Sequence, residues 1–217
     1  MNVTGAPGHV AVVILAAGTG SRMGRVKQML PLAGRPVLQH VLDAAAASGA
    51  GEIVVVLGHA ADEVTAALAL HPHARTVMAA DHREGQSASL RTGLRALGPG
   101  ARAAVILLGD QPTLPPEAIR SVIETFERTG GPVVQARYGG KPGHPVALGR
   151  AVWEAVEALR GDAGARDLLA EHPEWIVHAD VEGAPPPDLD TEEDYRRLST
   201  RRARGLTDEG DDQGGRR

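Results

Sequence analysis

The chain has 217 residues, which suits one α/β domain with a full hydrophobic core. Its formal net charge of -4 offers no basic footprint for nucleic acid, and the absence of cysteine excludes disulfides, thiolate catalysis and cysteine-ligated metal. No apolar run approaches the ~18–20 residues of a membrane span, and the first ten residues lack a signal-peptide core. We therefore expect a soluble, cytoplasmic protein that binds neither nucleic acid nor membrane.

Apolar runs alternate with helical patterns along the chain, which predicts a mostly parallel sheet covered by helices on both faces. Strands are expected at residues 10–15, 53–57, 75–79, 103–108 and 133–136, with shorter ones near 145–148 and 175–179. Helices are expected at residues 36–48, 60–70, 89–97, 116–128, 151–159 and 165–171.

Several residues suit the ends of these helices. Pro36 and Pro116 fit a first helical turn, and Gly49 fits a C-terminal cap. A last helix is expected to start at Thr191, with Asp194 completing a capping box. From residue 201 to 217 the chain is mostly charged residues and glycine, which predicts a disordered tail after a single domain over residues 1–200.

The first strand runs into the most informative segment of the chain, residues 12–27. Four β-favouring apolar residues lead into small residues and glycines, and the segment ends with Arg25 and Lys27. Glycine lets the backbone approach a ligand closely, and a turn of free N–H groups followed by cations suits a polyphosphate. The alternative is a glycine-rich surface turn without a ligand.

Two well-known phosphate loops do not fit this segment. The dinucleotide fingerprint G-x-G-x-x-G fails because Gly18, Gly20 and Gly24 span one residue too many. A P-loop fails because Lys27 is followed by Gln28 instead of Ser or Thr. The segment therefore predicts a phosphate-binding loop of another type.

Two acidic segments supply candidate ligands for a cation. Asp110 follows the strand at 103–108, at the end where open α/β sheets bind ligands, and a carboxylate beside a triphosphate suits Mg²⁺. Asp188 and Asp190 precede the last helix, and alternate residues of an extended segment share a side. Helix-cap or turn roles are the alternatives for these acids.

The pattern L-A-A-G-x-x-S-R-M-G-x-x-K at residues 15–27 resembles the signature loop of nucleotidyltransferases that join an NTP to a phosphorylated acceptor. Among these, the chain is most similar to the molybdenum cofactor cytidylyltransferases, through five motifs spread over residues 10–198. The resemblance implies a three-layer α/β/α sandwich with a mainly parallel mixed sheet, the Rossmann-like fold of nucleotide-diphospho-sugar transferases.

The resemblance also implies roles for the first loop and for the acids. Lys27 would neutralise the α-phosphate, Arg22 and the loop amides would hold the leaving pyrophosphate, and Asp110 would bind Mg²⁺. The family pattern D-x-D-T favours Asp190 over Asp188 as the second metal ligand. The nucleotide-binding residues of the loop would be Leu15, Ala16, Ala17, Gly18, Gly20, Ser21, Arg22 and Lys27.

A second family segment, G-x-S-x-S-L-R-x-G-L, occupies residues 85–94 and is expected to meet the nucleobase and ribose. Backbone groups of Ala16, Ala17 and Gly85, with the Gln86 amide and the Ser89 hydroxyl, have the donors and acceptors that a pyrimidine edge requires. The alternative for Ser89 is to cap its helix.

Two further segments resemble motifs on the acceptor side. His144, in a G-H-P motif, would bind acceptor phosphate or position the pterin, and its alternative is a structural turn residue. Arg166, in a G-D-x-G-A-R motif, suits a loop that closes over an anionic acceptor. Asp162 of the same motif has helix capping as its alternative.

The implied reaction converts CTP and molybdenum-bearing molybdopterin into the cytosine dinucleotide cofactor and pyrophosphate, with Mg²⁺ as cofactor. Guanylyl-transferring relatives tend to carry glycine where this chain has Ala17, and methionine where it has Gln111, so both residues favour CTP. The expected partners are CTP, the pterin acceptor, and a molybdoenzyme apoprotein or its chaperone.

Three alternatives stay open at this point. A guanylyltransferase or a sugar-1-phosphate nucleotidyltransferase would use the same first loop and Asp110, although a sugar pocket normally requires a longer chain after the third strand. A non-catalytic chaperone that delivers cofactor to a molybdoenzyme would not need the two metal-binding acids.

Overall fold

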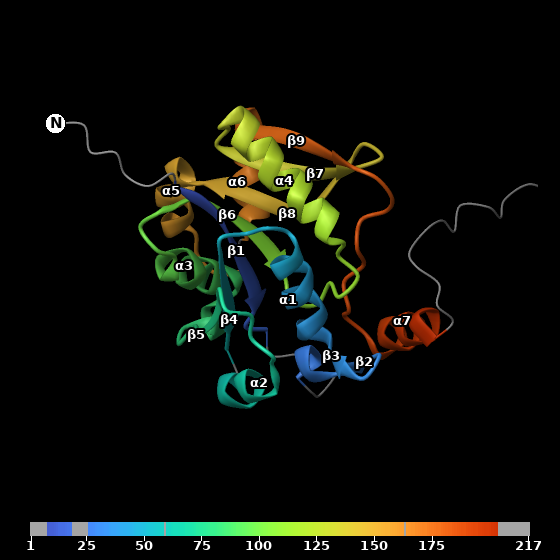
Figure 1. The fold of residues 1–217 in the computed structure, drawn as a ribbon. Coiled ribbons are helices and arrows are strands. Elements are labelled where there is room, and N and C mark those ends of the chain that lie inside the picture. Colours follow the sequence, from blue (N-terminus) through green and yellow to red (C-terminus); the bar gives the residue numbers. More distant parts are fainter. Residues whose placement is uncertain (1–7, 19–25, 59, 163, 204–217) are drawn as a thin grey trace, which may run out of the picture.

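The computed structural model describes residues 8–18, 26–58, 60–162 and 164–203 (Figure 1). Their main element is a seven-stranded sheet in the order β5-β4-β1-β6-β8-β7-β9. Strand β8 is antiparallel to both of its neighbours, and every other pair is parallel, so the predicted mainly parallel mixed sheet is confirmed. The strands are β1 (His9–Ala16), β4 (Glu52–Leu57), β5 (Ala74–Met78), β6 (Ala101–Leu108), β7 (Val133–Tyr138), β8 (Lys141–Gly149) and β9 (Ile176–Val181).

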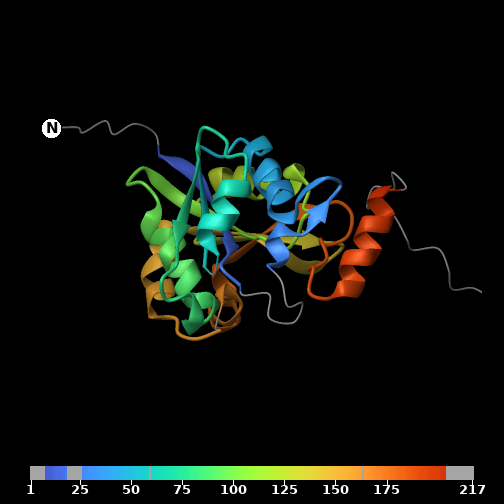
Figure 2. The same ribbon diagram turned by 90° about the horizontal axis from the view of Figure 1, so that it is seen from below.

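Helices cover both faces of this sheet (Figure 2). Val12 and Ile14 of β1 pack in one core with α1 and α4, while Val13 packs in a second core with α3, α5 and α6. Because helices cover both faces of β1, its sequence after His9 is a continuous run of apolar residues and does not alternate with polar ones. The helices are α1 (Val37–Ala47), α2 (Ala61–Ala67), α3 (Gln86–Ala96), α4 (Pro116–Thr129), α5 (Trp153–Ala158) and α6 (Ala165–Glu171).

Helix boundaries follow the predicted signals in most cases. Pro116 is the first residue of α4, Gly49 has a φ of 88° just after the last turn of α1, and Pro36 is the N-cap residue of α1. Helix α3 begins at Gln86, three residues before the predicted start, so Ser89 lies inside the helix and the cap alternative for it is wrong. The first turn of α3 is satisfied from outside, because the Ser87 N–H donates to the carbonyl of Gly161.

A small hairpin between the first loop and α1 was not predicted. The 3₁₀ helix η2 (Lys27–Met29) leads into β2 (Pro31–Leu32) and β3 (Arg35–Pro36). The two turn residues, Ala33 and Gly34, both have positive φ angles, as a two-residue hairpin turn requires. This hairpin lies on the side of the molecule where the last helix packs (Figures 1 and 2).

The last helix, α7 (Glu192–Ala203), begins with the predicted capping box. The Thr191 N–H and hydroxyl both donate to Asp194 Oδ2, and the Asp194 N–H donates to Thr191 Oγ1. The predicted tail started too early, since residues 201–203 are helical and Arg202 donates to the Pro112 carbonyl. The rest of the predicted tail, residues 204–217, lies outside the described residues.

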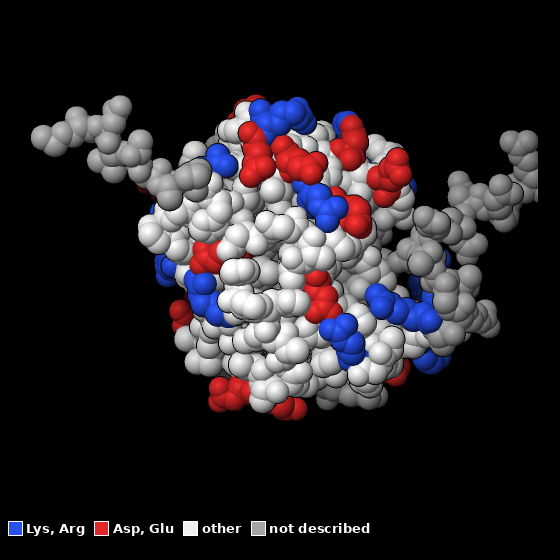
Figure 3. All heavy atoms as spheres, in the orientation of Figure 1, with Lys and Arg blue, Asp and Glu red and all other residues white. Residues whose placement is uncertain are grey.

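Figure 3 shows charged residues of both signs interspersed over α4 on the face of Figure 1. Within the part of the chain that the structure describes, no helix has the length and apolar content needed to cross a membrane.

The amino-terminal ends of three strands are joined by one carboxylate, Glu52 at the start of β4. It accepts from Arg75 at 2.7 Å, interacts with the His9 ring at 3.1 Å, and accepts from the Gly98 N–H at 3.2 Å. Burial alone raises the pKa of Glu52, but the bonds from Arg75, His9 and Gly98 outweigh it, and the pKa lies below its usual 4.5. The ionised carboxylate is thus stabilised by folding.

We expect Glu52→Gln to lower the free energy of unfolding by about 1–2 kcal/mol at neutral pH, because a largely buried charged acceptor is lost. The folded-state pKa lies below the unfolded one, so this stabilisation is full above the unfolded pKa of 4.5 and is lost as pH falls through the folded pKa. Denaturant unfolding of both proteins across this range measures the difference. Equal stability at neutral pH, or a difference that grows on acidification, contradicts the assignment.

Candidate active site

The carboxyl ends of β1 and β6 form the centre of the site. The chain goes from β1 to β4 on one side and later returns to β6 on the other, so these neighbours mark a reversal of strand order, where α/β sheets bind ligands. The contact between the two strands continues past the end of β6, where the Gly109 N–H donates to Leu15 O of β1 at 2.9 Å. A Cβ at Gly109 would lie 2.8 Å from Ala16 Cβ, so glycine is needed before Asp110.

Gln28 holds the end of β1 in place. Its buried side-chain amide donates to Ala16 O at 3.0 Å and to Gly18 O at 3.1 Å. The sequence pattern used Gln28 only as evidence against a P-loop. No local pattern predicts its contacts with Ala16 and Gly18, which lie 12 and 10 residues earlier in the chain. It follows Lys27 directly in η2, so the 3₁₀ helix that carries Lys27 is joined to the end of β1 through the Gln28 side chain.

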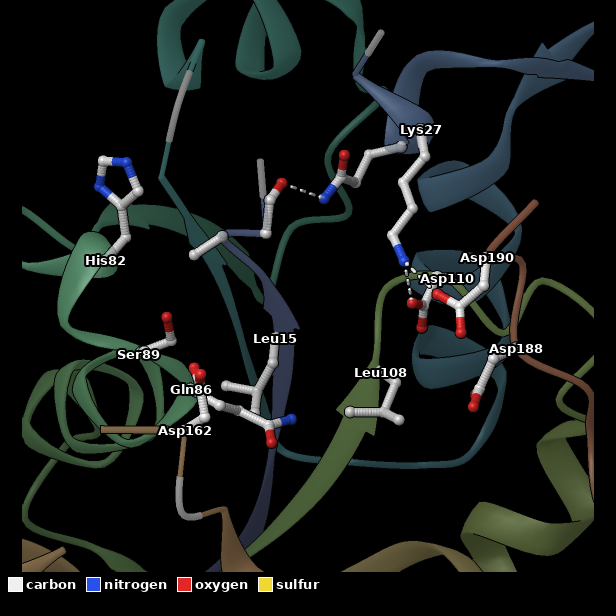
Figure 4. Close-up of a pocket in the computed structure, with 14 residues that line it drawn as sticks. Leu15, Lys27, His82, Gln86, Ser89, Leu108, Asp110, Asp162, Asp188 and Asp190 are labelled. Carbon is white, nitrogen blue, oxygen red and sulfur yellow. Dashed lines mark hydrogen bonds and ion pairs between the residues drawn. The ribbon is translucent and has the colours of Figure 1, made fainter. Parts of the chain in front are cut away.

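Three charged residues from distant parts of the chain meet above these strands (Figure 4). Lys27 Nζ lies 2.5 Å from Asp110 Oδ2 and 3.2 Å from Asp190 Oδ1. Burial lowers the pKa of Lys27, but attraction by the two carboxylates and hydrogen bonds to them outweigh it, so the pKa is raised above 10.5. Lys27 is therefore a fixed positive charge, and two carboxylates share it.

The segment before α7 is tied to the loop after β6. The buried residue Leu189 donates its N–H to the Asp110 carbonyl at 3.0 Å. The Gln111 side chain donates to Asp188 Oδ1 at 2.8 Å and, more weakly, to Pro186 O at 3.4 Å. Gln111 is absent from the pocket lining, so its contacts give no support to its use as a sign of CTP preference.

A pocket of about 530 Å³ extends from this charged group. Lys27, Asp110 and Asp190 lie at one end, Gln86, Ser89 and Asp162 lie at the other, and the side chains of Leu15 and Leu108 lie between (Figure 4). The predicted residues that line it are Leu15, Ala17, Gly18, Lys27, Gly85, Gln86, Ser89, Asp110, Asp188 and Asp190. Four further residues line the pocket without having been predicted as site residues: Gln28, His82, Leu108 and Asp162.

The end of the pocket opposite Lys27 is built by close contact between two loops. Gly85 has a φ of 103°, and a Cβ there would lie 2.4 Å from the Gly161 backbone and 2.6 Å from Asp162 Oδ1. The Ser87 hydroxyl also donates to Gly161 O, at 2.8 Å. Arg91 holds the same loop by donating to Leu159 O at 2.5 Å. These contacts direct Asp162 into the pocket, whereas the N-cap of α6 is Gly164.

The two residues expected on the acceptor side do not line this pocket. Arg166 is exposed in the first turn of α6. His144 is partly buried on β8, where its Nδ1 lies 3.4 Å from Ile106 O. Burial lowers the pKa of His144, with a further contribution from Arg166, so the imidazole is neutral at pH 7. Ala16 is buried beside the lining residues, and Gly20, Ser21 and Arg22 lie outside the described residues.

Comparison with known families gives a match over most of the chain. Residues 12–175 match the family model described as the MobA-like NTP transferase domain. Among curated proteins, the bifunctional protein GlmU of Sorangium cellulosum is 35% identical over 172 residues, which make up 76% of this chain and 36% of the relative. The chain therefore spans about a third of the length of that relative.

Solved structures share the fold over nearly the whole chain. Rv0371c from Mycobacterium tuberculosis H37Rv has a TM-score of 0.80 and 33% identity, over 90% of this chain and all of the other. The structure of its complex with manganese has a TM-score of 0.77 and 34% identity, and the match covers 88% of this chain and 98% of the other. A nucleotidyl transferase from Methanothermobacter has a TM-score of 0.75 and 26% identity, and the match covers 91% of this chain and 99% of the other.

Proposed function

The chain belongs to the family of MobA-like NTP transferase domains, and on that premise we propose that it transfers a nucleotidyl group from a nucleoside triphosphate to an anionic acceptor, releasing pyrophosphate. The observation that carries the proposal is the pair of carboxylates, Asp110 and Asp190, that share the Lys27 ammonium at one end of a nucleotide-sized pocket. The hydrogen-bonding side chains of Gln86 and Ser89 at the other end suit a nucleobase.

The donor set of the pocket fits a divalent cation. Its described lining residues include the carboxylates of Asp110, Asp162, Asp188 and Asp190 but only one lysine or arginine, Lys27, so a triphosphate would be repelled without further positive charge. Asp110 and Asp190 both reach one ammonium and would hold Mg²⁺, which binds through one or two carboxylates together with substrate phosphates and water. Among the described residues, no group of three or more His, Cys, Asp or Glu side chains is arranged to hold a metal ion.

When bound, Mg²⁺ supplies charge neutralisation to the phosphates. The acceptor's terminal phosphate oxygen attacks the α-phosphorus, forming a new P–O–P link, while the bond to the β-phosphate oxygen breaks and pyrophosphate leaves. The attacking group is already an anion, so no general base is required. The protein contributes by holding two anions in line and stabilising the transition-state charge. Lys27 acts at the α-phosphate, and the amides of the first loop, with Arg22, act on the leaving pyrophosphate.

We further propose CTP as the donor and molybdenum-bearing molybdopterin as the acceptor, which gives the cytosine dinucleotide cofactor. The support is the sequence resemblance together with Ala17, a buried residue of the pocket lining. The Ala17 carbonyl lies close to Gly58, since a Cβ built on Gly58 would be only 2.5 Å from the Ala17 oxygen. The backbone at Ala17 therefore has little space to move away from a larger base. His144 and Arg166 are proposed for the acceptor side, outside the pocket that holds the nucleotide.

We expect CTP to be used at least about tenfold better than GTP by kcat/KM, and Ala17→Gly to narrow that ratio. One methyl group that excludes a wider base is worth roughly 1–3 kcal/mol, or about 10–200-fold. Ala104→Gly removes a buried methyl from β6 outside the pocket lining and controls for backbone effects. Competition between the two nucleotides measures the ratio. Equal use by the wild type, or an unchanged ratio in Ala17→Gly, contradicts this role.

Pyrophosphate release from CTP, GTP and UTP, each with molybdopterin cofactor and with a sugar 1-phosphate, tests the proposed substrates. The proposal predicts release that requires CTP, the pterin and a divalent cation. Release that requires the sugar phosphate instead would assign a sugar-1-phosphate nucleotidyltransferase. Binding of the pterin without release from any nucleotide would assign a carrier.

A further inference from the structure

Helix α7 and the residues before it, which we call the C-terminal strap (residues 186–203), pack on a small core of their own. Leu189 and Leu198 of the strap cluster with Leu30, Leu32 and Val37, and Tyr195 packs against them. This cluster is separate from the two larger cores that hold the sheet to its helices. Figure 2 shows α7 at the edge of the molecule, beside the β2–β3 hairpin.

The strap carries Asp190 at a fixed point. Leu189, the residue before it, is 1% exposed and bonded through its N–H to the Asp110 carbonyl. Thr191, the residue after it, forms the reciprocal capping box with Asp194. Asp190 is therefore held between a buried leucine and a capped helix, and its position follows from where α7 packs.

The surface on which α7 packs is the segment that follows Lys27. Leu30 lies three residues after Lys27 and accepts from the Val37 N–H at 3.0 Å. The Tyr195 hydroxyl donates to the neighbouring Pro31 carbonyl, which joins the strap to β2. One small core thus fixes both the segment that presents Lys27 and the segment that presents Asp190.

We propose that Leu198 and Tyr195 are positioning residues, which bring Asp190 to Lys27 and Asp110 by fixing the strap on the β2–β3 hairpin. Neither residue lines the pocket, so they act through Asp190 and not on the substrate. The expected effect of these residues on kcat rests on the proposed nucleotidyl transfer. Their expected effect on the position of the strap does not depend on it. Because the cluster is separate from the main cores, weakening it releases the strap before it unfolds the sheet.

Hydrogen exchange of the Leu189 amide tests the positioning without any assay of activity. Leu198→Ala is expected to accelerate this exchange at least tenfold more than it accelerates exchange in β1. Ile123→Ala is the control: Ile123 of α4 is 8% exposed, as Leu198 is. It is expected to accelerate exchange of the Leu189 amide and of the β1 amides by the same factor. Leu198→Met keeps most of the side-chain volume and is expected to keep the slow exchange of the Leu189 amide. Tyr195→Phe loses only the hydroxyl that donates to Pro31 O and is expected to accelerate this exchange, as Leu198→Ala does. Equal acceleration in Leu198→Ala and Ile123→Ala overturns the proposal.

Nucleotidyl transfer in a second background tests the link to Asp190. Leu198→Ala is expected to lower kcat at least tenfold in the wild type but less than twofold in Asp190→Asn, since the group it positions is then already disabled. Ile123→Ala leaves kcat of the folded protein unchanged in both backgrounds. Equal losses in both backgrounds overturn the positioning role while transfer stands. If the wild type transfers no nucleotide, the proposed function fails, and the exchange result alone decides whether the strap positions Asp190.

Discussion

Replacing Asp110 with alanine is expected to lower kcat for nucleotidyl transfer at least about a hundredfold and to leave the fold intact. A hundredfold loss corresponds to about 2.7 kcal/mol of transition-state stabilisation, which is within the several kcal/mol that a bound divalent cation supplies. The side chain borders the pocket and fills no core space, and the backbone carbonyl that accepts from Leu189 stays in the variant. The change therefore removes the proposed metal ligand without creating a cavity.

A matched control is Asp180→Ala, which removes an exposed carboxylate paired with Arg137 at the far edge of the sheet. It is expected to retain kcat. Circular dichroism and thermal unfolding show whether each variant is folded, and steady-state kinetics over a range of Mg²⁺ concentrations measure the effect. A folded Asp110→Ala protein with near-normal activity would remove Asp110 from the metal site.

Lys27→Ala is expected to lower kcat by a similar factor, with a smaller effect on KM for CTP. Lys27 is assigned to the reacting phosphorus, where negative charge is redistributed in the transition state, so its loss acts mainly on the chemical step. The variant also leaves Asp110 and Asp190 without their shared cation, which adds repulsion toward an incoming triphosphate.

The other lysine of the chain, Lys141, is exposed at the start of β8, and Lys141→Ala is the control. Initial rates at saturating and at limiting CTP separate kcat from KM. If Lys27→Ala raises only KM for CTP, Lys27 binds the ground state and has no catalytic role.

The central parallel strands β1, β4 and β6 could be predicted from the sequence because they are apolar runs bounded by turn residues. The predicted strands at 10–15 and 53–57 differ from β1 and β4 by no more than one residue at either end. Strand β8 is longer than predicted, because Pro142 and Gly143 are poor strand formers and belong to it only through pairing with β7. Pairing between segments far apart leaves no local pattern.

The same limit separates the site residues that were predicted from those that were not. Lys27, Asp110 and Asp190 stand in recognisable motifs, and the structure brings their side chains together. Gln28 and Asp162 were missed as site residues because their roles depend on loops that meet only in the folded chain. Gln111 stands in a motif as well, but its side chain does not line the pocket and donates instead to Asp188 of the strap.

The fate of the two ends of the triphosphate tests nucleotidyl transfer most directly. The protein is incubated with Mg²⁺, the pterin acceptor and CTP labelled with ³²P at either the α- or the γ-phosphate, and the products are separated. Nucleotidyl transfer at this pocket predicts that the α-label appears in the dinucleotide product and the γ-label in pyrophosphate. Both products are expected to form at least about a hundredfold more slowly with Asp110→Ala. Transfer of the γ-label to the acceptor, or its release as inorganic phosphate with the α-label left in CDP, would contradict it.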